Sequence, residues 1–361
     1  MTGSYHFSVY NNKIRYEFDI NRNITIIKGN SATGKTTLLD ILNKVLLEEN
    51  SGFTVITDAK FVVFRNVYNQ SWKDTFIRNK NHIVFIDEDY RFVHDKEFLS
   101  ILQESGCYAV IVSRDPIESL PYSIKSVYGI RESSKYGGLA PIVNEFYELY
   151  DIDSIDLPKI NRVCTEDKKA GKQFFYSVFE NSSIIVDDAG GKSNIKNDLN
   201  KNDNTLYIVD GAAFGSNIEE FLYYKNESKR NSFIWAPESF EYLLLKSNII
   251  NIESIKDILN NPVNYIESSE YVSWERFFTA LLIKCTTGTI YKYSKSELNE
   301  IYKQDKVKSK IVDSFNDKIK SFIKSNTYNN IYTKQDKNEN TIVDKKSALD
   351  RLVDLASKEQ R

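Results

Sequence analysis

The sequence predicts an α/β protein with two successive α/β domains and a charged C-terminal tail. Short runs of β-favouring residues alternate with stretches of helical periodicity, and a glycine-rich turn joins one such strand to a helix near residue 30. A chain of 361 residues is also longer than one typical domain. We expect a mainly parallel sheet in residues 1–150, a second α/β domain in 158–300, and a mostly helical or flexible tail in 302–361.

Composition narrows the class of protein. Hydrophobic residues make up 41% of the chain and aromatic residues 13%, which is enough to build sizeable cores. The net charge of −2 gives no overall attraction for nucleic acid. Cys107, Cys164 and Cys285 have neither metal-ligand nor disulfide spacing, and no apolar run reaches membrane-spanning length. We therefore expect a cytoplasmic protein without membrane contact. Abundant Lys, Asn, Ile and Tyr are typical of an AT-rich bacterial genome.

The first domain begins with a predicted hairpin and a strand that enters a phosphate-binding motif. His6–Tyr10 and Ile14–Ile20 read as the hairpin, and Ile24–Ile27 as the following strand. The next residues match G-x-x-x-x-G-K-[ST], and an apolar helical pattern follows at once, which is the context this P-loop motif requires. The predicted ATP-binding residues are Gly29, Asn30, Ser31, Ala32, Thr33, Gly34, Lys35, Thr36 and Thr37.

Each part of the P-loop has a physical task. The glycines let backbone N–H groups surround phosphates, and the helix that follows points its positive end at them. Lys35 is expected to reach the β- and γ-phosphates, and the Thr36 hydroxyl to ligate Mg²⁺. ATP and Mg²⁺ are therefore the predicted cofactors.

A second motif follows short strands at 53–56 and 61–64 and a helix at 72–78. His82–Ile86 is an apolar strand that ends in Asp87-Glu88, where a parallel sheet places its ligands. Asp87 is predicted to hold Mg²⁺ and Glu88 to polarise the attacking water. After a helix at 96–104 and a strand at 108–112, Arg114 either senses the γ-phosphate, in cis or across a subunit interface, or only pairs with Asp115.

The P-loop and Asp87-Glu88 together resemble the additional-strand P-loop ATPases, the group that includes AAA, ABC and Zot-like proteins. The resemblance covers residues 1–130. Ser134-Lys135-Tyr136-Gly137-Gly138 is only a faint echo of the ABC signature, and the domain is too short for an ABC head. The resemblance implies a compact ATPase core of Zot-like or minimal type.

Strand and helix signals restart after residue 158. Predicted strands at 160–165, 184–186, 206–209 and 233–235 alternate with a helix at 172–179, and a further helix opens at Pro237. Gly191-Lys192-Ser193 is not a second P-loop, because Val186 replaces the required first glycine. Residues 251–285 read as helical with aromatic side chains for core packing, and 294–301 as a helix that closes the domain.

Two acidic residues follow strands of this second domain. Glu166 ends the first strand, and Asp210 ends the third. Carboxylates at the carboxyl ends of adjacent parallel strands converge, and they then either bind a divalent cation or shift each other's pKa. The alternative is an ordinary α/β domain whose acidic residues end strands in water.

The order of these features resembles the TOPRIM fold of OLD-type nucleases and PARIS-type phage-defence effectors. The resemblance implies that Glu166 acts in acid or base catalysis, that Asp210 holds Mg²⁺, and that the substrate is nucleic acid. Ala212 departs from the pattern, because TOPRIM domains carry a second Asp there. Either another acidic residue substitutes or the domain is an inactive binding module; the candidates are Asp167, Glu219, Glu220, Glu238 and Glu241.

These observations predict a Mg²⁺-dependent ATPase whose first domain gates a TOPRIM-like domain acting on or binding nucleic acid, in phage defence or mobile-element biology. One alternative is a non-catalytic ATP-dependent switch whose second domain is an inactive protein-binding module. Another is a small-molecule kinase, against which stands the lack of an Arg-rich lid. A protein partner or a homo-oligomer is compatible with the ATPase and with the switch. The mildly basic tail either contacts nucleic acid or is a solvated arm.

Overall fold

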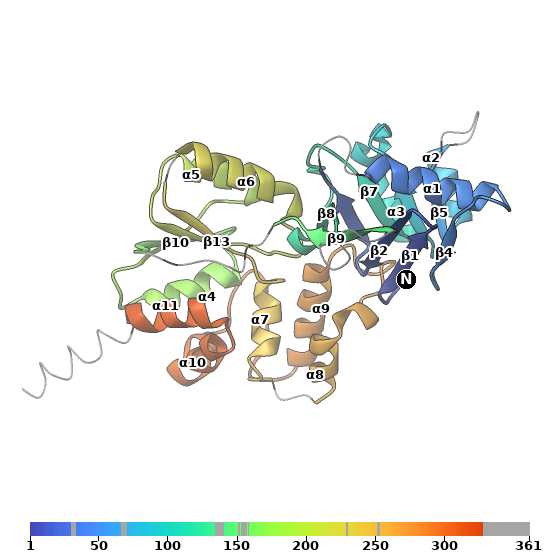
Figure 1. The fold of residues 1–361 in the computed structure, drawn as a ribbon. Helices are drawn as coiled ribbons and strands as arrows, with labels where there is room; N and C mark the ends of the chain where they lie inside the picture. Colours follow the sequence, from blue (N-terminus) through green and yellow to red (C-terminus); the bar gives the residue numbers. More distant parts are fainter. Residues whose placement is uncertain are drawn as a thin grey trace, which may run out of the picture.

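The computed structural model shows an α/β protein with two separate sheets (Figure 1). It describes residues 1–29, 34–65, 71–133, 141–150, 152, 157, 159–228, 230–250 and 253–327. The larger sheet is mixed and has nine strands, and the second is parallel and has four. The predicted α/β class is confirmed. The first sheet is mixed: five of its neighbouring strand pairs are parallel, and three are antiparallel.

The large sheet has the strand order β4-β1-β2-β9-β8-β3-β7-β6-β5. Its strands are β1 Tyr5–Tyr10, β2 Ile14–Ile20, β3 Ile24–Ile27, β4 Thr54–Ile56, β5 Phe61–Val63, β6 Ile83–Ile86, β7 Tyr108–Val112, β8 Val127–Glu132 and β9 Ile142–Glu148. Its helices are α1 Lys35–Leu47, α2 Trp72–Arg78 and α3 Phe98–Ser105, with short 3₁₀ turns η1 Arg91–His94 and η2 Ile124–Ser126. The predicted hairpin is present as the antiparallel β1–β2 pair.

The central strands are apolar throughout because both faces of the sheet are covered. Every residue of β3, β6 and β7 is buried. On one face Ile83 and Phe85 pack with α1, and on the other Val84 and Ile86 pack with α2 and α3. The strands β8 and β9 escaped prediction because Arg, Glu and Asn interrupt their apolar residues.

The second sheet has the strand order β11-β10-β12-β13, with every pair parallel. Figure 1 shows α5 and α6 on one of its faces and α4 and α11 on the other. The strands are β10 Arg162–Thr165, β11 Ile185–Asp188, β12 Thr205–Ile208 and β13 Ser232–Trp235. The helices are α4 Ala170–Phe179, α5 Ile195–Leu199, α6 Gly215–Ser228, α7 Phe240–Lys246, α8 Glu253–Asn260, α9 Trp274–Thr286, α10 Asp305–Asp313 and α11 Asp317–Thr327, with 3₁₀ turns η4 Lys192–Asn194, η5 Pro262–Asn264 and η6 Glu300–Lys303.

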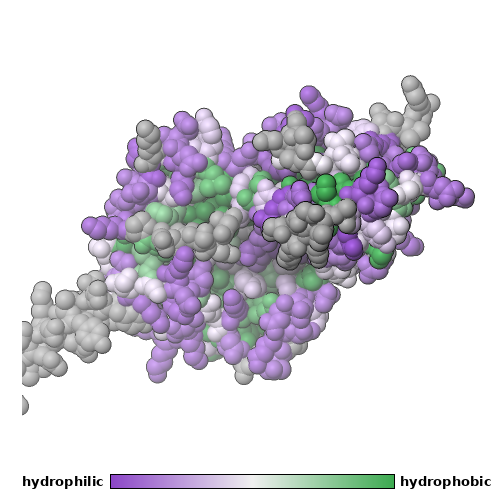
Figure 2. Space-filling model, in the orientation of Figure 1, coloured by the Kyte–Doolittle hydropathy of each residue, from purple (hydrophilic) through white to green (hydrophobic). Residues whose placement is uncertain are grey.

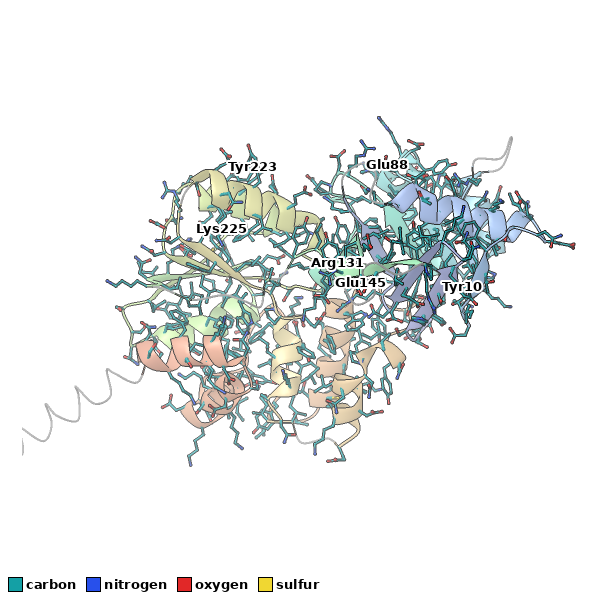
Figure 3. The ribbon with its side chains drawn as sticks, in the orientation of Figure 1. Tyr10, Glu88, Arg131, Glu145, Tyr223 and Lys225 are labelled. Carbon is teal, nitrogen blue, oxygen red and sulfur yellow. The ribbon has the colours of Figure 1, made fainter. Side chains whose placement is uncertain are left out.

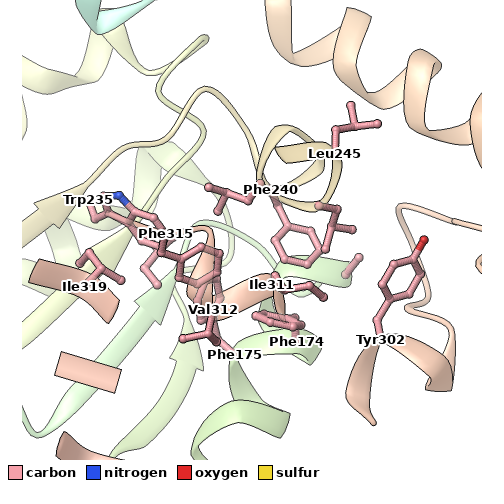
Figure 4. Close-up of a cluster of buried hydrophobic side chains, with 14 of the residues drawn as sticks. Phe174, Phe175, Trp235, Phe240, Leu245, Tyr302, Ile311, Val312, Phe315 and Ile319 are labelled. Carbon is pink, nitrogen blue, oxygen red and sulfur yellow. The ribbon is translucent and has the colours of Figure 1, made fainter. Parts of the chain in front are cut away.

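The core of the second part includes residues beyond the predicted boundary at 300. Phe174 and Phe175 of α4 pack with Phe315 and with apolar residues of α10 and α11, as Figure 4 shows. The segment 305–327 is therefore helical and packed, although its composition resembles a charged tail. Spaced apolar positions such as Ile319 and Phe322 supply a buried stripe, while the lysines and acids face solvent.

The predicted helix at 294–301 is wrong. Residues 291–299 form an irregular segment that crosses the start of α4, and within the predicted range only residues 300 and 301 belong to a 3₁₀ turn, η6. The Lys295 carbonyl accepts a hydrogen bond from Ala170 N at 3.0 Å, and Gln173 Oε1 accepts one from Leu298 N at 2.9 Å. These tertiary contacts satisfy backbone groups that a helix would satisfy internally.

Hydrophilic side chains dominate the outer surface in the view of Figure 2. Within the described part of the chain, no helix combines the length and apolar character needed to cross a membrane.

Candidate functional site

Three parallel strands bring the first group of predicted site residues to one edge of the large sheet. The strand β7 lies between β3 and β6, and all three run in the same direction. Gly29 follows β3, Asp87 follows β6, and Arg114 follows β7. We call this group, with Lys35 and Glu88, the P-loop edge.

The strand-to-helix turn of the P-loop needs glycine. Gly34 has φ 85°, and a Cβ there would lie 2.9 Å from the Tyr16 hydroxyl. Gly29 also has positive φ, at 142°. Asn30, Ser31, Ala32 and Thr33 lie outside the described residues. Lys35 then starts the 13-residue helix α1, and Thr36 and Thr37 are exposed in its first turn.

Lys35 is held over the turn by its own loop. Its Nζ donates a hydrogen bond to the Gly29 carbonyl at 2.7 Å, and the residue is buried. Burial lowers the pKa of Lys35; the negative charge of Glu88 opposes this shift, and the positive charge of Arg114 adds to it. An anion bound beside Lys35 would restore the stability of its charged form.

The two acids after β6 have different environments. Asp87 is buried, and its Oδ1 accepts a hydrogen bond from Glu88 N at 2.8 Å. Glu88 pairs with Arg114, whose Nε and Nη2 donate at 2.9 and 2.7 Å. The predicted Arg114–Asp115 pair is therefore wrong, because the guanidinium fits the Glu88 carboxylate in a bidentate pair. Figure 3 shows Glu88 at the upper side of this part of the molecule.

The residues of the P-loop edge suit a Mg²⁺ ion that is shared with phosphates. Thr36 offers an exposed hydroxyl, and Asp87 keeps one carboxylate oxygen beyond the one that Glu88 N occupies. Mg²⁺ in such sites takes one or two protein ligands and completes its shell with water and phosphate oxygens. This arrangement needs no group of three protein ligands, and none is present among His, Cys, Asp and Glu residues in the described ranges.

A second group of predicted residues meets at the carboxyl ends of β10 and β12. Glu166 follows β10, Asp210 follows β12 by two residues, and the two strands are neighbours. Both residues line a small cavity of about 50 Å³. Its wall also contains Thr165, Asp167, Lys169, Ala170, Gly171, Lys172, Phe175, Ile208, Val209, Pro237, Phe240, Glu241, Leu243, Tyr293 and Lys295.

Close backbone contacts shape this cavity. Gly211 N donates to the Pro237 carbonyl at 2.6 Å, and a Cβ at residue 211 would lie 2.4 Å from the Ala236 carbonyl oxygen. Asp210 Oδ1 accepts a hydrogen bond from Phe240 N at 3.2 Å. The glycine after Asp210 is therefore required by the approach of the segment that leads into α7.

Helix α7 and the irregular segment add polar and charged groups to the cavity. Tyr293 donates its hydroxyl to Glu241 Oε1 at 2.7 Å, and Lys295 Nζ lies 3.8 Å from the same oxygen. Lys295 also donates to Glu275 of α9. We call Glu166, Asp210, Glu241 and Glu275 the acid cluster.

Burial and mutual repulsion shift the protonation of these groups. The pKa of Asp210 lies well above its usual range, mainly because of burial and also because of the negative charges of Glu275 and Glu241. Burial also raises the pKa of Glu166, and the negative charge of Glu275 adds to this shift. Burial lowers the pKa of Lys295, but Glu241, Asp210 and Glu275 outweigh burial and raise it overall. Lys295 therefore carries the positive charge among these acids.

The structure separates the proposed substitutes for the missing Asp at position 212. Asp167 and Glu241 line the cavity. Glu219, Glu220 and Glu238 instead pair with Lys28, Lys196 and Arg22, respectively.

Sequence reasoning missed three residues around the acid cluster, namely Glu275, Tyr293 and Lys295. Glu275 lies in residues 251–285, where the aromatic pattern predicts core packing, and Lys295 lies in residues 294–301, which the sequence predicts to be a helix. No local pattern marks them, because they come within reach of Asp210 only when the chain folds back.

Two ion pairs join the parts that carry these sites. Arg22, in the turn between β2 and β3, donates twice to Glu238 at 3.1 and 2.8 Å and stacks 3.6 Å from the Trp274 ring. Lys28, which directly precedes Gly29, pairs with Glu219 of α6. Arg22 and Lys28 are both buried, whereas Glu238 is 14% and Glu219 47% exposed, so the two parts share a polar interface in which the Arg22–Glu238 pair is the more desolvated.

Comparison with known protein families finds none that matches the chain. Comparison with curated proteins finds no significant match either.

Proposed function

We propose that the protein binds ATP with Mg²⁺ at the P-loop edge and hydrolyses it. One observation carries the proposal: β3, β7 and β6 bring Lys35, Asp87 and Glu88 to the same sheet edge, although about 50 residues separate the motifs. The helix α1 points its N-terminus at this edge, where it favours an anion.

Each described residue of the edge has a role in this proposal. Lys35 neutralises the β- and γ-phosphate oxygens, and Thr36 and Asp87 would hold Mg²⁺, which supplies electrostatic stabilisation of the transferred phosphoryl group. Glu88 accepts a hydrogen bond from a water whose oxygen attacks the γ-phosphorus. The bond to the ADP oxygen breaks, and the proton of the water passes to Glu88 or to solvent.

The strand order supports a place among the additional-strand P-loop ATPases. The strand β7 is inserted between the P-loop strand β3 and the strand β6 that carries Asp87. Arg114, at the end of this inserted strand, contacts Glu88 directly. The inserted strand thus positions the Arg114 guanidinium close to the place where we propose that the γ-phosphate lies.

We propose that the nucleotide state controls the second α/β part through the shared polar interface. Lys28 is adjacent to Gly29, so movement of the P-loop would displace Lys28 and change its ion pair with Glu219 of α6. Arg22 holds Glu238, which lies three residues before Glu241 of the acid cluster. The proposed partner of the second part is nucleic acid, which the resemblance of its sequence to the TOPRIM fold implies, in phage defence or mobile-element biology.

Calorimetric titration with ATP and Mg²⁺ tests nucleotide binding. Lys35→Ala is expected to weaken binding at least about 30-fold, which corresponds to about 2 kcal/mol for one lost charge-assisted hydrogen bond. Lys44→Ala is the matched control, because Lys44 lies on the same helix and is exposed. Equal affinity in wild type and Lys35→Ala would contradict the proposal.

A second candidate function is an ATP-dependent switch without turnover. The observation that favours it is the Arg114–Glu88 pair, which occupies the carboxylate that hydrolysis requires. Tight ATP binding with no phosphate release, in both wild type and Glu88→Gln, would select the switch.

The nucleic-acid proposal is tested in the same assay with added DNA or RNA. Stimulated hydrolysis together with strand cleavage that Glu166→Ala abolishes would establish an ATP-coupled nuclease. Binding without cleavage would leave the second part as a nucleic-acid binding module. No binding and no stimulation would exclude both.

A further inference from the structure

The carboxylates of the acid cluster are already engaged by other groups of the protein. Ala212, two residues after Asp210, is buried and offers no ligand atom. Asp210 already uses Oδ1 to accept the Phe240 N–H, and Glu241 Oε1 accepts the Tyr293 hydroxyl. The remaining space contains a side-chain cation of the protein itself, Lys295.

The surroundings of Lys295 fix its ammonium among the acids. Its Nζ donates to Glu275, lies 3.8 Å from Glu241 Oε1, and interacts electrostatically with Asp210. These three carboxylates come from α9, α7 and the loop after β12, so the ammonium connects elements that are distant in sequence. An opposite charge at this range is the main compensation that buried carboxylates can obtain.

The backbone around Lys295 is also held in place. Its carbonyl accepts a hydrogen bond from Ala170 N at the start of α4. The side-chain amide of Gln173, also on α4, donates a hydrogen bond to the Ser296 carbonyl at 3.1 Å and accepts one from Leu298 N. The side chain is only 28% exposed. The ammonium is therefore placed by the fold and not by chance contact of a surface side chain.

We propose that the ammonium of Lys295 takes the place of a divalent cation, so that the acid cluster is a metal-independent site. A Mg²⁺ ion brought among the same carboxylates would meet the positive charge of Lys295 at close range, which opposes its binding. Glu241 Oε2 is buried without a partner among the described residues, and the cavity has room for water beside it. The second part then binds its partner without metal-dependent cutting at this site.

Counting bound Mn²⁺ in nucleotide-free protein, by electron paramagnetic resonance of the free ion, tests the proposal without any activity assay. Wild type and Asp210→Asn are expected to bind the same number of Mn²⁺ ions, because no ion depends on Asp210. Lys295→Met, which keeps the length of the side chain and removes its charge, is expected to gain one ion per chain. Lys295→Met with Asp210→Asn should lose that ion again.

Two results would overturn the proposal. The first is a wild type that binds one Mn²⁺ more than Asp210→Asn, since this ion would use the acid cluster with Lys295 present. The second is a folded Lys295→Met variant that gains no Mn²⁺ ion, since the Lys295 ammonium would then not stand in the place of a divalent cation. If Lys295→Met does not fold, the comparison of wild type with Asp210→Asn still decides. ATP binding through Lys35 is measured separately, so failure here leaves the proposed ATPase intact.

Discussion

The P-loop edge and the acid cluster are both built where parallel strands end, yet they balance their charges in different ways. At the P-loop edge, the Arg114 side chain is 62% exposed and pairs with Glu88 at the surface, while Lys35 donates a hydrogen bond to a backbone carbonyl of its own loop. In the acid cluster, Lys295 and Tyr293 compensate carboxylates that are largely buried.

These two ways of balancing charge predict which of the two sites can exchange its ionic partners. An exposed ion pair is worth little, so a phosphate can replace Glu88 as the partner of Arg114 at small cost. Breaking a buried pair leaves an uncompensated charge and costs several kcal/mol. We therefore expect the P-loop edge to bind and release a ligand, and the acid cluster to keep its internal partners.

The largest expected effect separates the chemistry of the two sites. Glu88→Gln should lower ATP hydrolysis by about 10²- to 10⁴-fold, because it removes the group that accepts the proton of water, while ATP affinity stays within a few fold. Glu166→Gln should leave basal hydrolysis unchanged. Phosphate release and ATP titration measure both variants. A similar loss of hydrolysis in Glu166→Gln would mean that the two sites act as one.

The next effect concerns the interface that connects the sites. Arg22→Ala should lower the free energy of unfolding by about 3–5 kcal/mol, because Glu238 would remain buried without its partner. Arg131→Ala is the matched control, since Arg131 also pairs with a glutamate, Glu145, and stacks on a tyrosine but is 59% exposed (Figure 3). We expect the control to cost less than about 1 kcal/mol in urea unfolding. Equal losses would contradict a buried coupling contact.

A smaller effect follows from the raised pKa of Asp210. In the folded chain this carboxyl binds its proton more tightly than in the unfolded chain, so its stabilising contribution is complete below the unfolded value of about 4 and is lost as pH rises through the folded value. Asp210→Asn should therefore be more stable than wild type near neutral pH, by on the order of 1 kcal/mol. The gain should shrink as the pH falls toward 4. Urea unfolding across this pH range measures it, and a gain that grows on acidification would contradict the assignment.

The smallest expected effect is at the surface of the P-loop edge. Arg114→Ala should leave the unfolding free energy of nucleotide-free protein almost unchanged, because its pair with Glu88 is exposed to solvent. The same substitution should weaken ATP binding if Arg114 moves from Glu88 to the γ-phosphate. Thermal unfolding with and without ATP measures both. Loss of several kcal/mol without nucleotide would show that the pair is a structural contact.

Local sequence was sufficient to predict much of the first part. Gly34 and Lys35 predict a strand-to-helix turn. The backbone conformation at residue 34 favours glycine, and the motif places its lysine at the start of the helix that follows. The strand before Asp87 was also readable, since both faces of it are buried and its residues are apolar without interruption. The predicted catalytic and metal-binding roles of Lys35, Glu88, Glu166, Thr36, Asp87 and Asp210 remain predictions.

Local periodicity and turn chemistry were enough to predict the α/β class, the strand–turn–helix context of Lys35 and the positions of Glu166 and Asp210 at strand ends. They could not predict that β7 separates β3 from β6, that Arg114 pairs with Glu88, or that Lys295 lies among the acids. Such facts depend on which distant segments share buried space. Desolvation and Coulomb attraction between those segments act only after folding has brought them together.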